Sequence, residues 1–143
     1  MSQYQLNDWK ILVIDDEPDS LEVASMLLTM YGATVYTASN GRKGLEIARD
    51  QQPHFIISDL SMPEMGGWEM ILKAQDNPAT RDIPMIALTA HAMTGDRERA
   101  IAAGFHNYLT KPLIPETFIA DVMRLVSNIP QLSDLLNTSK VTA

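Results

Sequence analysis

Short apolar runs alternate along the chain with amphipathic segments, and this alternation predicts strands and helices in turn. The runs from Ile11 to Ile14 and from Phe55 to Asp59 show almost no polar alternation. Such runs are typical of strands that are covered on both faces in a parallel sheet. The expected strands cover residues 11–14, 34–38, 55–59, 85–89 and 107–110.

Apolar residues recur at helical spacing between these runs, and capping or breaking residues bound each segment. Asn40 is a suitable N-cap for the second segment, while Gly32 and Gly104 are suitable ends for the first and fourth. The helices are therefore expected from Asp19 or Ser20 to Gly32, from Asn40 to about Asp50, from Trp68 to Gln75, from Thr94 or Asp96 to Gly104, and over the apolar stripe from Phe118 to Ile129.

Strands that alternate with helices favour a parallel, doubly wound sheet, because right-handed crossovers lay helices on both faces. Five such units predict an α/β flavodoxin-like fold with five strands in the order 2-1-3-4-5 and five helices. We expect an N-terminal extension over residues 1–9, one domain over 10–127 and a tail over 128–143. Residues 1–8 are expected to fray, with Trp9 covering one end of the core.

Composition narrows the possible functions. The 143 residues are 45% hydrophobic and 20% charged, which suits one globular domain. The sequence lacks cysteine and has no stretch long enough for a membrane span, so we expect a cytoplasmic protein without membrane insertion. The formal net charge of -7 would repel a nucleic-acid backbone, and direct binding to nucleic acid is not expected.

Chemically useful side chains follow the predicted strands. Asp15 and Asp16 come after the first strand, Asp59 ends the third, Thr89 ends the fourth and Lys111 follows the fifth. The carboxyl ends of parallel strands share one edge of the sheet, where ligands bind in such folds. We therefore expect these five side chains to converge there.

Three crowded carboxylates repel one another, and desolvation adds to the cost of keeping them ionised, so the site calls for a cation. Oxygen ligands without histidine or cysteine favour Mg²⁺. A carboxylate beside a divalent cation, an ammonium and a hydroxyl is suited to phosphoryl transfer. Asp59 is the expected acceptor, with Lys111 and Thr89 as catalytic groups.

Four blocks of sequence follow the predicted strands in order, between about Lys10 and Ser127. They are Val13-Ile14-Asp15-Asp16-Glu17, Ser58-Asp59-Leu60-Ser61-Met62-Pro63 with Gly66, Leu88-Thr89-Ala90, and Tyr108-Leu109-Thr110-Lys111-Pro112. In these blocks the chain resembles a known family, the receiver (response regulator) domain of two-component signalling, which includes single-domain receivers such as the chemotaxis response regulator.

The resemblance implies a chemistry in detail. Asp59 would accept a phosphoryl group from a histidine kinase or a histidine phosphotransfer protein. Asp16 and Asp59 would bind Mg²⁺ directly, together with the backbone carbonyl of Ser61. Asp15 would act on the metal mainly through a bound water, and a cis peptide bond would follow Lys111.

The resemblance also implies a switch rather than a turnover enzyme, with phosphorylation and dephosphorylation catalysed by the domain itself. Thr89 and Tyr108 match the family's switch pair. Thr89 would turn toward the new phosphoryl group, and Tyr108 would rotate into the vacated space. The face formed by the fourth helix, fifth strand and fifth helix, roughly residues 93–127, would then meet a downstream protein. Either a monomer or a phosphorylation-dependent dimer is compatible with this scheme.

Three alternatives stay open at this point. The chain could be a receiver module of a larger hybrid histidine kinase. A Mg²⁺-dependent phosphatase with an aspartyl nucleophile would need an Asp-x-Asp pattern at the first strand, which Asp15-Asp16-Glu17 lacks. A flavin or nucleotide carrier would need a phosphate-cradling loop there, and Glu17-Pro18-Asp19 is the opposite of one.

Overall fold

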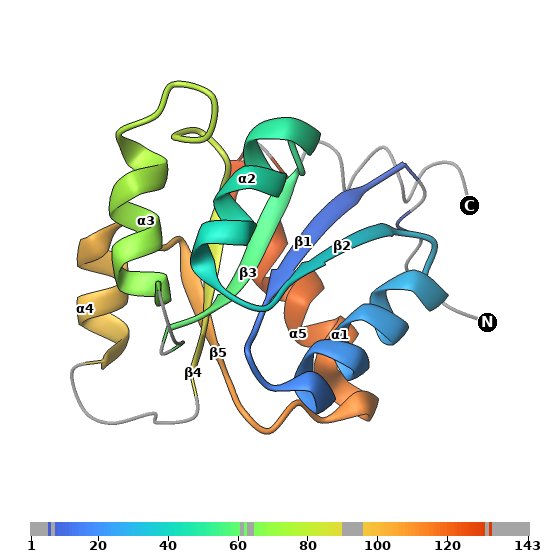
Figure 1. Cartoon of the computed structure of the whole chain (residues 1–143). Coiled ribbons are helices and arrows are strands. Elements are labelled where there is room, and N and C mark those ends of the chain that lie inside the picture. Colours follow the sequence, from blue (N-terminus) through green and yellow to red (C-terminus); the bar gives the residue numbers. More distant parts are fainter. Residues whose placement is uncertain are drawn as a thin grey trace.

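The computed structural model describes residues 6, 8–60, 62, 65–89, 96–130 and 132. It shows a parallel sheet with helices on both faces (Figure 1). The elements in chain order are β1 (Lys10–Ile14), α1 (Pro18–Met30), β2 (Thr34–Ala38), α2 (Gly41–Gln51), β3 (Phe55–Asp59), α3 (Gly67–Gln75), β4 (Met85–Thr89), α4 (Asp96–Ala103), β5 (Asn107–Thr110) and α5 (Pro115–Ser127).

All strand pairs are parallel, and the strand order is β2-β1-β3-β4-β5. The predicted fold class and strand order are therefore confirmed. The register pairs Ile14 with Ser58 and Asp59 with Leu88. This register brings the carboxyl ends of β1, β3 and β4 to the same edge of the sheet, with β5 beside β4.

Alternate residues of the central strands face two separate cores. Ile11, Val13 and Ile57 pack with α1 and α5 on one face, while Leu12 and Ile14 pack with α2, α3 and α4 on the other. Figure 1 shows the same division into a central sheet and two helix layers. Burial on both faces explains why the strand sequences lack polar alternation.

The boundaries of some elements differ from the prediction. The first helix begins at Pro18 with Glu17 as N-cap, rather than at Asp19 or Ser20. Proline is well suited to the first helical position, because its missing N–H would have no partner there. Asn40 does cap α2, since its Oδ1 accepts a hydrogen bond from the Lys43 N–H at 2.9 Å.

The core reaches beyond residues 10–127 at both ends. Leu6, Trp9, Ile129 and Leu132 are all buried in the cluster shared with α1 and α5. The expectation that residues 1–8 fray is therefore wrong for Leu6, whose N–H donates to the Tyr31 carbonyl at 2.7 Å. Within the described residues, no helix combines the length and the apolar character that a membrane span requires.

Candidate functional site

Two strand ends bring Asp15 and Asp59 together. Asp15 follows β1, and its backbone N–H donates to the Ala38 carbonyl at the end of β2. Asp59 is the last residue of β3, where the next backbone N–H, from Leu60, donates to the Leu88 carbonyl of β4. The Asp15 and Asp59 side chains are 0% and 9% exposed. Two carboxylates are thus held in a nearly dry edge of the sheet.

Lys111 lies between these two carboxylates. Its Nζ is 3.0 Å from Asp15 Oδ1 and 3.0 Å from Asp59 Oδ2, and its side chain is 7% exposed. The Lys111 backbone N–H donates to the Thr89 carbonyl at 2.8 Å, which fixes the residue against the end of β4. The Lys111–Pro112 peptide bond is cis, as the family resemblance implied.

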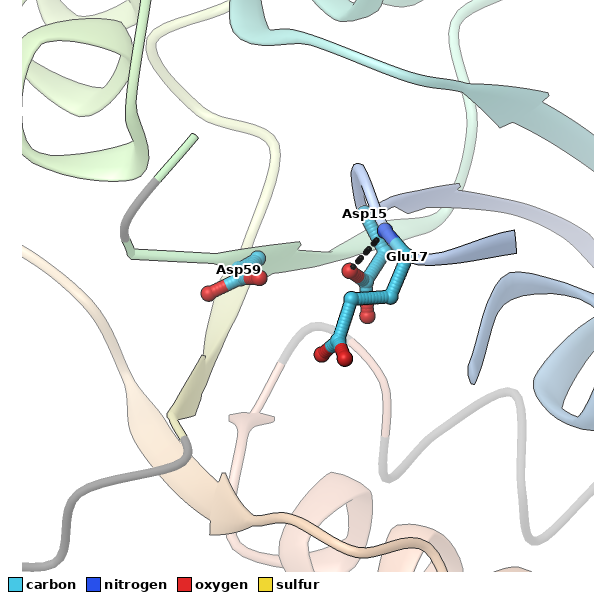
Figure 2. Close-up of side chains that lie close together, drawn as sticks. All are labelled: Asp15, Glu17 and Asp59. Atoms are coloured by element: carbon cyan, nitrogen blue, oxygen red, sulfur yellow. Dashed lines mark hydrogen bonds between the residues drawn. The ribbon is translucent and has the colours of Figure 1, made fainter. Parts of the chain in front are cut away.

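Glu17 adds a third carboxylate to the cluster. Its backbone N–H donates to Asp15 Oδ1 at 2.9 Å, and this short turn brings the Glu17 side chain back toward the strand edge (Figure 2). The carboxylate forms an ion pair with the Lys111 ammonium while remaining 60% exposed. One oxygen from each of Asp15, Glu17 and Asp59 lies within 4.8 Å of the others.

The ionisation of the cluster reflects burial and charge together. Burial raises the pKa of Asp15 from 3.8 to about 6. The Glu17 N–H and the Lys111 ammonium oppose this rise, while the Asp59 charge adds to it. Burial would lower the pKa of Lys111, but hydrogen bonds to Glu17, Asp59 and Asp15 outweigh it and raise that pKa above its ordinary value. Lys111 is therefore a permanent cation at physiological pH.

One oxygen of the cluster supports a cation site. Asp15 Oδ2 is buried and accepts no hydrogen bond, although the Lys111 ammonium lies within 3.0 Å of it. Buried carboxylate oxygens normally have hydrogen-bond partners or bind a metal. The oxygen-only set of Asp15, Glu17 and Asp59 suits a hard cation such as Mg²⁺. The residues present thus fit the cation that the sequence predicts.

Thr89 and Tyr108 lie on the strands beside this cluster. Thr89 is the last residue of β4, is buried, and is paired with Thr110 in the register. Tyr108 is half-buried on β5, opposite Ala87, and the Arg97 guanidinium carbon lies 6.0 Å from the centre of its ring. Thr89 thus ends β4, while Tyr108 is the second residue of β5 and lies further from the strand end.

The other two predicted metal ligands have different outcomes. Asp16 is exposed and does not belong to the group of three carboxylates, whereas its neighbour Glu17 does. Ser61, whose backbone carbonyl was the expected third ligand, lies outside the described residues. Sequence reasoning missed Glu17 because three acids follow one another after β1. A signal was nevertheless present, since Asp15 two residues before Glu17 can accept its N–H in an Asx turn.

Comparisons with known proteins agree with this geometry. A sequence model of the response regulator receiver domain matches residues 11–123. An uncharacterised 14.6 kDa protein of Leptolyngbya boryana is 40% identical over 116 residues, which are 81% of this chain and 86% of that protein. The polar-differentiation response regulator DivK of Brucella anthropi is 31% identical over 112 residues, or 78% of this chain and 91% of DivK.

Longer proteins also contain a similar segment. The DNA-binding dual master transcriptional regulator RpaA of a Synechocystis strain is 34% identical over 139 residues, but the match spans only 58% of RpaA and 93% of this chain. The chemotaxis response regulator CheY4 of Vibrio cholerae has a similar structure, with a TM-score of 0.76 and 30% identity. That alignment covers 82% of this chain and 98% of CheY4.

A receiver domain of a signal transduction histidine kinase is comparably similar. This domain, from Syntrophus aciditrophicus, has a TM-score of 0.72 and 30% identity, and the alignment covers 85% of this chain and 92% of the domain. Similar domains thus occur in proteins named as single response regulators, as transcriptional regulators and as kinases.

Proposed function

The chain belongs to the response regulator receiver domain family of two-component signalling, and we propose that it accepts a phosphoryl group on Asp59 from a phosphohistidine. The donor would be a histidine kinase or a histidine phosphotransfer protein. One observation carries the proposal: the Lys111 ammonium is hydrogen-bonded to both Asp59 and Asp15 in a nearly dry site at the carboxyl edge of the sheet.

The reaction requires a nucleophile and a way to neutralise charge. A carboxylate oxygen of Asp59 attacks the phosphorus atom, and the bond from phosphorus to the histidine nitrogen breaks, leaving a neutral imidazole once that nitrogen is protonated. The Lys111 ammonium donates to the Asp59 carboxylate and orients it, and it can donate to the phosphoryl oxygens as negative charge gathers on them. Thr89 supplies a hydroxyl donor on the neighbouring strand.

Asp16 and Asp59 would hold Mg²⁺ directly, together with the Ser61 carbonyl that the family resemblance implies, and Asp15 would act mainly through a bound water. A bound Mg²⁺ would neutralise charge on the phosphoryl oxygens. Asp15 presents a buried oxygen without a hydrogen-bond donor, and this oxygen supports the assignment. Glu17 is paired with Lys111 at the rim of the site.

Phosphorylation would be transmitted by Thr89 and Tyr108 to the face formed by α4, β5 and α5. Thr89 would donate to the phosphoryl group, and Tyr108 would turn inward, away from Arg97. A downstream protein would bind this face, and the same face would serve a phosphorylation-dependent dimer. The protein would act in the cytoplasm, without direct binding to nucleic acid, as a switch that catalyses only its own phosphorylation and dephosphorylation.

Mass spectrometry after incubation with acetyl phosphate tests the proposal. We expect a base-labile phosphoryl adduct on Asp59 that requires Mg²⁺ and disappears in excess chelator. Asp59→Asn should fold and form no adduct, and the exposed Asp50→Asn is a matched control that should react like the wild type. Mg²⁺-dependent labelling of Asp59→Asn at another residue would show that the acceptor is wrong.

A further inference from the structure

The chain that follows the acceptor strand returns to touch the start of α2. The Gly41 N–H donates to the Met65 carbonyl at 2.9 Å. Gly41 is the first residue of α2, and its N–H is one of those that have no partner inside the helix. The hydrogen bond therefore joins the N-terminus of α2 to Met65, six residues after Asp59.

Gly41 permits this contact because it has no side chain. A Cβ atom at residue 41 would lie 2.7 Å from the Met65 carbonyl oxygen, 3.0 Å from Met65 Cγ and 3.2 Å from Met70 Cβ. The nearest of these atoms belongs to the backbone, so a side-chain rotation cannot relieve the clash. Gly41 is not among the glycines with positive φ. Space, rather than backbone conformation, requires glycine here.

Gly66 and Gly67, which follow Met65, lie against the end of the acceptor strand. The Gly67 N–H donates to the Leu60 carbonyl at 3.0 Å. A Cβ atom at Gly67 would lie 2.4 Å from the Asp59 carbonyl oxygen, and one at Gly66 would lie 2.7 Å from the Leu60 carbonyl oxygen. Gly66 and Gly67 are therefore held close to Asp59 and Leu60, while Met65 is held against α2.

The α2 helix is itself fixed to β1. A Cβ atom at Gly44, one turn after Gly41, would lie 2.3 Å from Ile14 Cδ1. Ile14 is the residue directly before Asp15, and Asn40 caps the helix beside it. The first turn of α2 thus contacts the strand that carries Asp15 and the loop that follows Asp59.

From these contacts we propose that Gly41 is a positioning residue for phosphoryl transfer. It sets the distance between the α2 terminus and Met65, and thereby the placement of Met65 to Gly67, which lie against Asp59 and Leu60, relative to Asp15. The inference rests on the proposed phosphorylation of Asp59. Gly41 makes no contact with reacting atoms and acts only through the Met65 carbonyl.

Two substitutions test this role. Gly41→Ala adds the clashing methyl group in a helix where alanine is otherwise preferred. Gly41→Pro adds the same Cβ atom and also removes the donor N–H. Proline otherwise suits this first helical position because Asn40 before it is extended, with φ -155° and ψ 169°. Glu46→Ala is the control, because it shortens an exposed side chain of the same helix and adds no atom against Met65 or β1.

The assay measures the rate constant of phosphorylation by acetyl phosphate and the Mg²⁺ affinity by titration calorimetry, at a temperature where thermal unfolding shows each variant folded. We expect both Gly41 variants to lose about tenfold or more in the rate constant, since small displacements of reacting groups have effects of this order. Glu46→Ala should keep the wild-type rate constant within about twofold.

Equal rates for the Gly41 variants and the wild type would overturn the inference, and so would an equal loss in Glu46→Ala. The temperature at which each variant unfolds is measured in the same series, so that a rate constant lost by unfolding is distinguished from one lost in the folded protein. A wild-type protein that takes up no phosphoryl group would instead contradict the proposed function, so that the two failures are distinguishable.

Discussion

Replacing Lys111 by methionine removes the only ammonium observed between the carboxylates of the described site while keeping a side chain of similar length. The Lys111 Nζ lies 3.0 Å from oxygens of both Asp15 and Asp59, whose side chains are less than a tenth exposed. The variant leaves these two buried carboxylates without their common partner. It should therefore lower the free energy of unfolding in the absence of divalent cations.

The size of this loss follows from burial and from the pKa of Asp15. Loss of one partner from a buried ion pair costs about 3–5 kcal/mol, whereas the contact with Glu17, which is 60% exposed, contributes about 1 kcal/mol or less. Protonation limits the loss, because a carboxyl group with a pKa of about 6 takes up a proton at pH 7 for about 1.4 kcal/mol. We expect Lys111→Met to lose about 2–3 kcal/mol at pH 8.

The pH dependence has a definite sign. The pKa of Asp15 in the folded protein is about 6, above its ordinary value of 3.8. Its contribution to stability is fully present below 3.8 and is lost as the pH rises through 6. Lys111 lowers the pKa of Asp15 in the wild type. In the variant, the protonated Asp15 therefore keeps its contribution to stability up to a higher pH. The difference in unfolding free energy between the two proteins should shrink as the pH falls from 8 to 5.

Urea unfolding followed by tryptophan fluorescence measures these differences, with chelator and with Mg²⁺. The exposed Lys73→Met is the control and should stay within about 0.5 kcal/mol of the wild type. Mg²⁺ at about 100 times its dissociation constant should return about 2.7 kcal/mol to the variant. A variant as stable as the wild type at pH 8, or a difference that does not change with pH, would refute the ionic reasoning.

Three further predictions concern neighbouring residues. Asp16→Asn should weaken Mg²⁺ binding in calorimetry more than Glu17→Gln does, because the buried ammonium already neutralises Glu17; the reverse order would assign the metal to Glu17. Burial lowers the pKa of His54, so its contribution to stability is lost as the pH falls below 6.5, and His54→Asn should flatten the decline in thermal stability between pH 7 and 5. A double-mutant cycle of Trp68→Ala and Arg99→Ala, whose ring centre and guanidinium carbon are 4.7 Å apart, should give a coupling of about 0.5–1 kcal/mol, and additivity would exclude a stabilising contact.

The central strands were predictable because β1, β3 and β4 are buried on both faces, whereas the edge strands β2 and β5 are partly exposed. The strands β2 to β5 were predicted with the observed bounds, and in β3 and β4 the apolar residues stop where the strand leaves the core. The first residue of each helix was harder to predict, because more than one residue near the start can act as the N-cap. The α1 helix begins at Pro18, before the predicted start at Asp19 or Ser20. This earlier start is possible because the first helical turn tolerates a residue without an N–H. The burial of Leu6 depends on distant packing against α1 and α5, which no local pattern reveals.

The site was predictable in its strand-end residues and not in its loop residues. Asp59 and Lys111 are fixed by the parallel topology, which brings strand ends to one edge whatever the loops do. The choice between Asp16 and Glu17 depends on a turn of two residues, where a rotation about one backbone bond exchanges which side chain faces the site. Asp15 decides the outcome here by accepting the Glu17 N–H, so that Glu17 lies over Lys111 and Asp16 faces solvent.

The charge of the cluster explains why Lys111 alone cannot neutralise the site once Asp59 is phosphorylated. Asp15, Glu17 and Asp59 share one ammonium, so these four side chains carry two uncompensated negative charges when all are ionised. Phosphorylation replaces the Asp59 carboxylate charge with about -1.5 to -2, which makes the site more negative. A bound Mg²⁺ would offset this charge. The Lys111 Nζ already lies 3.0 Å from Asp59 Oδ2, so it is placed to donate to a phosphoryl group on that side chain, whereas the exposed Glu17 carboxylate can exchange its contact with Lys111 for water.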